Sequence, residues 1–283
     1  MLRIAIQSKG RLYEESMALL EEAGIKIPGG KRTLLVPARN FPVEVLFLRD
    51  DDIPESVASG VTDVGIVGLN EVMEKRCPVG ILKKLGFGKC RLSLAIPQDI
   101  DYLDRNWFSG KKIATSYPGI LSDYLHQNGI VSDIHVITGS VEIAPGIRLA
   151  DAIFDIVSSG STLVSNRLKE VETVGESDAV LLGTDCFSPE KRGLVDELLF
   201  RFDSVQAADD KKYILMNVPQ KKLNDVLSVL PGIKSPTVMP LADKEWCSVH
   251  TVLDEKCFWE IINRLKTAGA EGILVLDIEK MIL

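Results

Sequence analysis

The first two thirds of the chain alternate short apolar runs with amphipathic helical segments, and this alternation restricts the possible fold more than any other feature. Residues 3–7 predict a strand, and the helical pattern that follows places Leu12, Leu19 and Leu20 on one face before it ends at Gly24. Repeated strand–helix units form parallel sheets that helices cover. We therefore expect an α/β fold whose ligands lie beyond the carboxyl ends of the strands.

The alternation occurs in two series, which predict two lobes on either side of a cleft. Residues 80–96 are strand-rich and broken by Gly86 and Gly88, as is typical of a crossover between lobes. A second series begins with a strand over residues 112–116, and a helix from about residue 190 returns the chain to the first lobe. Helical patterns of the second series cover residues 120–127, 142–149 and 162–168. The expected lobes are residues 1–95 with 179–208, and residues 96–178.

The final segment, residues 209–283, has a different pattern. Its expected order of strand, helix, strand, strand, helix, strand is that of a ferredoxin-like domain. The second helix places Phe258, Ile261 and Leu265 on one face, as expected of a helix that covers a sheet. Because nothing in this segment resembles a catalytic constellation, we interpret it as a regulatory or assembly module.

Charge and cysteine content argue against several classes of function. The chain has 40 acidic and 33 basic residues, a net charge of −7 and no Lys/Arg tract, so no nucleic acid partner is expected. No apolar run approaches the roughly 18 residues of a membrane span, so no membrane partner is expected. The 5 cysteines lack a Cys-x-x-Cys pair, which favours reduced thiols in the cytoplasm, and the 3 histidines lack metal-ligand spacing.

The most informative stretch is residues 151–162, in which an apolar strand with two carboxylates, Asp151 and Asp155, leads into small residues and a helix. Small hydroxyl and glycine residues before a helix can close backbone amides around an anion. These residues are Ser158, Ser159, Gly160, Ser161 and Thr162. Carboxylates just before such a cradle suit the hydroxyls of a sugar phosphate. The alternative is a plain helix cap with Asp155 as a solvated strand end, and the stretch alone leaves both open.

Three further loops follow expected strands. Lys9, Gly10 and Arg11 suit a polyphosphate, although an ordinary βα turn has the same composition. Arg49, beside carboxylates, can hold a phosphate with two hydrogen bonds. Tyr117 can stack on a base, or can simply be fixed in a turn by the proline that follows it. Together these loops outline one cleft with cations, an anion cradle, carboxylates and an aromatic side chain.

The sequence resembles the long form of the ATP phosphoribosyltransferase family, the first enzymes of histidine biosynthesis. The likeness covers nearly the whole chain and is carried by R-I-A-I-Q-S-K-G-R-L, L-R-D-D-D-I-P, G-K-C-R-L-S-L-A, K-I-A-T-S-Y-P, G-S-V-E-I-A-P and A-D-A-I-F-D-I-V-S-S-G-S-T-L. The C-terminal S-P-T-V-M-P-L-A and I-L-V-L-D-I-E-K-M belong to the same likeness. It implies a two-lobed core like that of periplasmic binding proteins, with a C-terminal ferredoxin-like (ACT-like) regulatory domain.

The resemblance also implies a reaction. N1 of ATP attacks C1 of phosphoribosyl pyrophosphate, and pyrophosphate leaves with the help of Mg²⁺ and cationic side chains. Residues 158–162 would hold the 5-phosphate, and Asp151 and Asp155 the ribose hydroxyls. The remaining expected substrate contacts are Lys9, Gly10, Arg11 and Arg49 for the polyphosphates, Tyr117 for adenine and Glu142 beside the sugar. No residue stands out as a covalent nucleophile, so direct displacement is expected.

For the C-terminal module the resemblance implies inhibition by histidine and a homo-oligomer, either dimer or hexamer. The matching effector residues are Asn217, Ile233, Ser235, Thr237 and Gly272. Two other functions fit the residues alone. A non-catalytic sensor also has two lobes and a cleft, and another phosphoribosyltransferase would use the same sugar-phosphate cradle for a different base.

Overall fold

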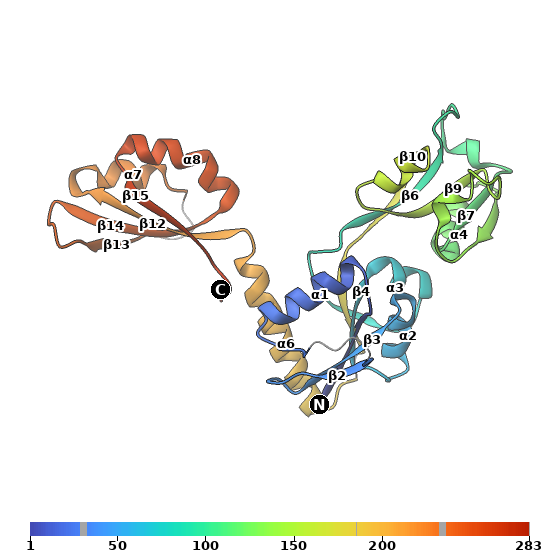
Figure 1. Ribbon diagram of the computed structural model, residues 1–283, viewed down its shortest axis with the longest axis horizontal. Coiled ribbons are helices and arrows are strands. Elements are labelled where there is room, and N and C mark those ends of the chain that lie inside the picture. Colours follow the sequence, from blue (N-terminus) through green and yellow to red (C-terminus); the bar gives the residue numbers. More distant parts are fainter. Residues whose placement is uncertain (29–32, 185, 232–235, 283) are drawn as a thin grey trace. The chain divides into compact units, whose positions relative to one another are not determined.

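The computed structural model describes residues 1–28, 33–184, 186–231 and 236–282 of the chain. The chain divides into two compact units, Met1–Glu197 and Leu198–Leu283. The first unit contains two α/β lobes, each with its own sheet, and the second unit contains one more sheet (Figure 1). The expected fold class, a two-lobed α/β core followed by a ferredoxin-like domain, is confirmed. None of the helices described is both long and apolar enough to span a bilayer.

The first lobe has a six-stranded sheet in the order β2-β3-β1-β4-β11-β5. Its strands are β1 (Leu2–Gln7), β2 (Leu35–Pro37), β3 (Val43–Leu48), β4 (Val64–Gly68), β5 (Gly80–Lys84) and β11 (Ala179–Gly183). Its helices are α1 (Arg11–Glu22), η1 (Asp50–Asp52), α2 (Ile53–Ala58) and α3 (Leu69–Lys75). Strands β3 and β4 both run parallel to β1, so their carboxyl ends lie along one edge of the sheet. Ile53 and Val57 of α2 are fully buried against this sheet.

The second lobe has a five-stranded sheet in the order β10-β6-β9-β7-β8. Its strands are β6 (Cys90–Pro97), β7 (Lys112–Thr115), β8 (Asp133–Val136), β9 (Ala152–Val157) and β10 (Leu168–Ser177). Its helices are η2 (Arg105–Phe108), α4 (Pro118–Gln127), η3 (Val141–Ile143) and α5 (Ser161–Ser165). Strand β7 is parallel to β8 and β9, whereas β6 is antiparallel to β9 and β10. The amino end of β6 therefore lies at the same edge as the carboxyl end of β9.

Two crossovers join the lobes. The run of residues 80–96 splits into β5 of the first sheet and β6 of the second, with left-handed backbone at Gly86 (φ 82°) and Gly88 (φ 64°) between them. The predicted crossover is thus confirmed. The return crossover passes from β10 to β11 through Asp178. The second sheet begins at Cys90, ahead of the expected lobe boundary at residue 96.

Two helix predictions in the second lobe are wrong. Residues 142–149 form only the short turn η3 followed by irregular backbone, because Pro145 and Gly146 interrupt the helical pattern. The helix predicted over residues 162–168 ends at Ser165, and Arg167 turns the chain with φ 57° so that β10 begins at Leu168. The loop before α5 is therefore followed by little more than one helical turn.

The helix α6 (Pro189–Ala208) leads into the second unit, whose four-stranded sheet has the order β13-β14-β12-β15. Its strands are β12 (Lys211–Pro219), β13 (Thr237–Pro240), β14 (Trp246–Asp254) and β15 (Glu271–Asp277). The helices α7 (Leu223–Val229) and α8 (Glu255–Ala268), which follow β12 and β14, both lie on one face of this sheet (Figure 1). They bury Ile214, Met216 and Val249 beneath them. The predicted order of elements is confirmed.

The glycines of the first unit give a test of its packing. A Cβ at Gly65 of β4 would lie 2.6 Å from Cγ2 of Ile53 and 3.1 Å from Cγ2 of Val57, so α2 would have to move. We expect Gly65→Ala to reduce the free energy of unfolding by about 1–3 kcal/mol, measured by urea denaturation. Gly193 in α6 has no atom within 4 Å of the added Cβ, and Gly193→Ala should stabilise by up to about 1 kcal/mol. Equal urea midpoints for both variants would contradict this packing.

Candidate functional site

The loop after β9 has the geometry of an anion cradle. It runs through Ser158 and Ser159 to Gly160, whose left-handed backbone (φ 79°) caps α5. The hydroxyls of Ser159 and Ser161 lie 3.0 Å apart, and the Ser161 amide donates weakly to Ser159 Oγ at 3.4 Å. The loop borders a cavity of about 170 Å³. We call this cavity the donor cavity. The polar side chains that line it are Glu142, Asp155, Ser158, Ser159 and Thr162.

Asp155 is the carboxylate nearest to this loop. Burial, reinforced by the negative charge of Glu142, raises the pKa of Asp155 to about 6, although the Ile156 amide, 2.8 Å from Oδ1, acts in the opposite direction. The carboxyl group is therefore mostly ionised at pH 7. Such a group can accept hydrogen bonds from sugar hydroxyls and can stabilise a neighbouring positive centre.

The structure does not bring Asp151 to the same place. Asp151 precedes β9, and its Oδ2 accepts a hydrogen bond of 2.9 Å from the Lys112 amide. Asp155 is four positions farther along the chain, which corresponds to about 13 Å at the spacing of a strand. The contact expected between Asp151 and the ribose hydroxyls does not follow from this geometry, in which its carboxylate fixes the start of β7.

A second cavity, of about 290 Å³, borders the first, and both are lined by Ile156 and Ser158. We call it the acceptor cavity. Arg11 enters it from the first turn of α1, with its Nε 3.0 Å from Glu15 Oε1. One buried oxygen, Glu15 Oε2, has no hydrogen-bond partner among the described residues. Asp50 and Glu71 also line this cavity, which therefore combines one arginine with several acceptors.

The two other expected cations, Lys9 and Arg49, follow β1 and β3 on exposed loops at the same edge of the sheet. Lys9 is exposed, and Gly10 has left-handed backbone (φ 89°) at the start of α1. The side chain of Arg49 is 76% exposed, and its Nε lies 3.6 Å from Asp51 Oδ1. Neither Lys9 nor Arg49 lines the two cavities described above. Both are free enough to reach toward a long polyphosphate.

Tyr117 lines the acceptor cavity but is only 7% exposed. Its hydroxyl donates to Glu71 Oε1 at 3.0 Å and accepts from Asn70 Nδ2 at 3.1 Å. Burial, the nearby carboxylates and the bond to Glu71 raise the pKa of Tyr117 far above its ordinary value, so the hydroxyl stays a donor. The open stacking surface expected for a base is therefore covered in this conformation.

Comparison with known proteins identifies the family. A family model described as ATP phosphoribosyltransferase matches residues 49–204, and a model described as the HisG C-terminal domain matches residues 208–280. The chain is 69% identical over 283 residues to the ATP phosphoribosyltransferase of Bacteroides fragilis, and all of both chains is covered. The chain belongs to the ATP phosphoribosyltransferase family.

Further relatives agree with this assignment. The ATP phosphoribosyltransferase of Cytophaga hutchinsonii is 56% identical over 281 residues, covering 99% of this chain and 98% of that protein. A chain of the ATP phosphoribosyltransferase (HisG:HisZ) complex from Thermotoga maritima has 27% sequence identity and a TM-score of 0.62, covering 71% of this chain and 96% of that chain. The expected enzyme class, a pentosyltransferase of histidine biosynthesis, is confirmed. The alternative of a non-catalytic sensor is not supported by these relatives.

The sequence analysis missed one set of contacts between the lobes of this ATP phosphoribosyltransferase family member. They join the carboxyl end of α3 and the residue after it to α4 of the second lobe. Glu74 accepts hydrogen bonds from the amides of Gly119 (2.8 Å) and Ile120 (2.9 Å), and Arg76 pairs with Asp123 at 2.6 Å. Their only signal in the sequence is a polar helix after a buried strand, which is common on protein surfaces.

The fit of Mg²⁺ depends on the carboxylates of the donor cavity. No group of three or more His, Cys, Asp or Glu side chains in the described ranges could hold a metal ion by itself. Mg²⁺ usually keeps several waters and binds through substrate phosphates with one or two carboxylates. Glu142 and Asp155, which line the same cavity, provide that number. The residues present therefore fit a cation that arrives with its substrate.

The expected effector residues of the second unit are only partly described. Ile233 and Ser235 lie outside the described residues. Asn217 of β12 and Gly272 of β15 are close, since a Cβ at Gly272 (φ 55°) would lie 3.4 Å from Asn217 Nδ2. Thr237 is in register with His250 on the adjacent β14. Thr237 lies on β13, the opposite edge strand from β15, so it is about 14 Å across the sheet from Gly272, whereas Asn217 and Gly272 are neighbours.

Glu71 gives a pH-dependent prediction. Burial, with a smaller contribution from Asp50, raises the pKa of Glu71 to about 7, so its neutral form is favoured in the folded state. Stability from this group is present below the unfolded pKa near ~4.3 and is lost as pH rises through 7. We expect wild-type stability to fall by about 2–3 kcal/mol more than that of Glu71→Gln between pH 5 and pH 8 in urea unfolding. The exposed variant Glu14→Gln should follow the wild type, and identical profiles for all three proteins would contradict the prediction.

Proposed function

We propose that the donor cavity binds phosphoribosyl pyrophosphate and that the acceptor cavity binds the adenine of ATP. The observation that supports this division is the shared border: Ser158 and Ile156 line both cavities, so a sugar in one can face a base in the other. Phosphoribosyl is then transferred to N1 of ATP, and pyrophosphate is released.

The donor is held at both ends of its sugar. The amides and hydroxyls of residues 158–162 bind the 5-phosphate. The left-handed turn at Gly160 makes this loop compact, which suits a small anion. Asp155 and Glu142 accept hydrogen bonds from the ribose hydroxyls. Their negative charge also favours the positive character that C1 gains as the pyrophosphate leaves. Asp151 precedes β9 and does not line the donor cavity, and we assign it to the support of β7.

The acceptor is held by the first lobe. Arg11 lines the acceptor cavity, and we assign it to the leaving pyrophosphate, with Lys9 and Arg49 on the neighbouring loops for the remaining phosphates. Tyr117 forms one wall for the adenine. The reaction is a direct displacement, in which the two substrates are oriented and the developing charge is neutralised without a covalent enzyme intermediate.

A divalent cation completes the donor site in this proposal. When bound, Mg²⁺ neutralises negative charge on the pyrophosphate as it leaves. Glu142 and Asp155 would hold the cation together with the substrate, because both carboxylates line the donor cavity. The carboxylates thus orient the donor from the side of its hydroxyls.

We further propose that histidine inhibits through the second unit and that the protein is a homo-oligomer in the cytoplasm. Asn217 and Gly272 support the first statement, because they bring a side-chain amide next to exposed backbone on the adjacent strands β12 and β15. The five free cysteines favour a reducing compartment.

Thr162 gives the test of the donor assignment. Thr162→Val removes one hydroxyl from the donor cavity at nearly constant volume. Because a hydrogen bond to a charged group contributes about 1.5–3 kcal/mol, we expect KM for phosphoribosyl pyrophosphate to rise about tenfold or more, with KM for ATP within twofold. Ser165→Ala is the matched control, since its hydroxyl bonds to the Ser161 carbonyl on the same helix. An equal rise of both KM values would reject the assignment.

Asn217 gives the test of the regulatory assignment. Asn217→Ala removes the amide that borders Gly272, and we expect the histidine concentration for half-inhibition to rise about tenfold, as for the loss of one buried hydrogen bond. Inhibition is measured relative to each variant's own rate without histidine. Asn224→Ala on α7, which covers the opposite face of the sheet, should keep the wild-type response. Unchanged inhibition of Asn217→Ala would exclude this residue from the effector site.

A further inference from the structure

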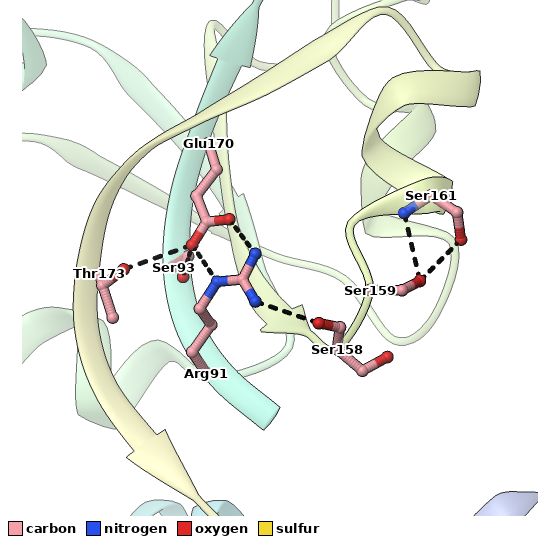
Figure 2. A network of polar contacts seen from close by, with 7 residues as sticks. All are labelled: Arg91, Ser93, Ser158, Ser159, Ser161, Glu170 and Thr173. Atoms are coloured by element: carbon pink, nitrogen blue, oxygen red, sulfur yellow. Dashed lines mark hydrogen bonds and ion pairs between the residues drawn. The ribbon is translucent and has the colours of Figure 1, made fainter. Parts of the chain in front are cut away.

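The motif G-K-C-R-L-S-L-A at residues 88–95 carries part of the family resemblance but has no role in the proposed substrate contacts. Its Arg91 and Ser93 lie on β6, whose amino end is next to the loop that follows β9 (Figure 2). Arg91 is in register with Val157, the last residue of β9. The motif is therefore adjacent to the anion cradle although the two are far apart in the sequence.

Arg91 makes three hydrogen bonds from three nitrogens (Figure 2). Nε and Nη2 donate to the two carboxylate oxygens of Glu170, each at 2.5 Å, and Nη1 donates to the backbone carbonyl of Ser158 at 3.1 Å. The ion pair holds the pKa of the Glu170 carboxyl below its ordinary value. Only an arginine side chain can make a two-pronged bond to a carboxylate and a third bond in the same plane.

Glu170 is aimed at Arg91 by an irregularity in β10. The pairing of β10 with β6 shifts between Glu170 and Glu172, which leaves one extra residue in β10. Because of this bulge Glu170 and Thr173 lie on the same face of the sheet, where both reach Ser93. Ser93 Oγ donates to Glu170 Oε1 at 2.7 Å, and Thr173 Oγ1 donates to the same oxygen at 3.3 Å. The carboxylate is thus fixed on several sides.

The bond to Ser158 acts on the orientation of one peptide unit. In a planar trans peptide the carbonyl and the following N–H point in opposite directions. When Arg91 holds the Ser158 carbonyl on its own side, the Ser159 N–H is turned to the other side, and within the described ranges that N–H makes no hydrogen bond. Ser159 lines the donor cavity, as does Gly160. The guanidinium also lies close beneath the loop, with Nη2 4.0 Å from where a Cβ of Gly160 would be.

We propose that Arg91, held by Glu170, is a positioning residue for the donor's 5-phosphate. It fixes the peptide between Ser158 and Ser159 so that the Ser159 amide is directed at the phosphate before the substrate arrives. An amide that is already oriented binds an anion without the loss of loop freedom on binding. The inference rests on the proposed binding of the 5-phosphate at residues 158–162 and adds a residue outside that loop.

The test compares the binding of each substrate in Arg91 variants of the full chain. For Arg91→Met and Arg91→Lys we expect KM for phosphoribosyl pyrophosphate and the Kd for ribose 5-phosphate, measured by calorimetry, to rise about tenfold or more. KM for ATP should stay within twofold of the wild type. Lysine does not rescue binding, because an ammonium group cannot bond to Glu170 and to the Ser158 carbonyl in one plane. Arg105→Met, at an exposed arginine of the same lobe that bonds to Asn128, is the matched control and should keep wild-type values.

Glu170→Gln supplies a second, milder variant if Arg91→Met does not fold. It keeps the size of the side chain but weakens the hold on the guanidinium, so the Kd for ribose 5-phosphate should rise severalfold, and amide hydrogen exchange in residues 158–162 should become faster. An unchanged Kd in folded Arg91 or Glu170 variants would overturn the proposal, as would an equal loss of both substrates. If Thr162→Val also leaves the Kd for ribose 5-phosphate unchanged, the assignment of the donor cavity fails. If Thr162→Val raises this Kd but the Arg91 variants do not, the assignment of the donor cavity stands and only the role of Arg91 is rejected.

Discussion

The donor cavity depends on the left-handed backbone of one residue, Gly160. With φ 79° it turns the chain between β9 and α5 within three residues, so that the amides and hydroxyls of the loop converge on one small volume. A residue with a side chain would be destabilised there by about 1–2 kcal/mol. The helix that follows has only five residues, so its dipole adds little, and the cradle relies on local hydrogen-bond donors. Those donors need external support, which explains why an arginine from another strand holds the Ser158 carbonyl.

Carboxylates surround two cavities that are proposed to bind highly anionic substrates. Asp155 and Glu142 line the donor cavity, and Asp50 and Glu71 line the acceptor cavity. Different parts of each substrate explain this arrangement. Phosphates need hydrogen-bond donors and cations, whereas sugar hydroxyls and an amino group need acceptors such as carboxylates. Burial and the charge of Asp50 raise the pKa of Glu71 to about 7, so part of the repulsion in the acceptor cavity is relieved by protonation. A buried carboxyl group of this kind reduces stability at high pH.

The sequence predicts what depends on local pattern and misses what depends on distant contacts. Strand–helix alternation and the crossover at Gly86 and Gly88 are local signals, and both are confirmed. The bond between Arg91 and Glu170 joins residues 79 apart, so no window of sequence contains it. Asp151 shows a related limit. The sequence pattern shows that residues four apart in a strand share a face. They nevertheless lie about 13 Å apart, and this distance is too long for both to contact one sugar.

In the acceptor cavity, the residues that hold Tyr117 belong to the same helix that joins the two lobes. Tyr117 is held by Asn70 and Glu71 of α3, while Glu74 of the same helix binds the first amides of α4. These bonds fasten the second lobe to the first, and the Tyr117 side chain between them is buried. If the adenine stacks on Tyr117, as proposed, the buried ring has to become exposed, whereas the bonds of Glu74 to α4 need not break. In that proposal the contact between α3 and α4 is the fixed point of the two lobes, and Tyr117 is the part that adjusts.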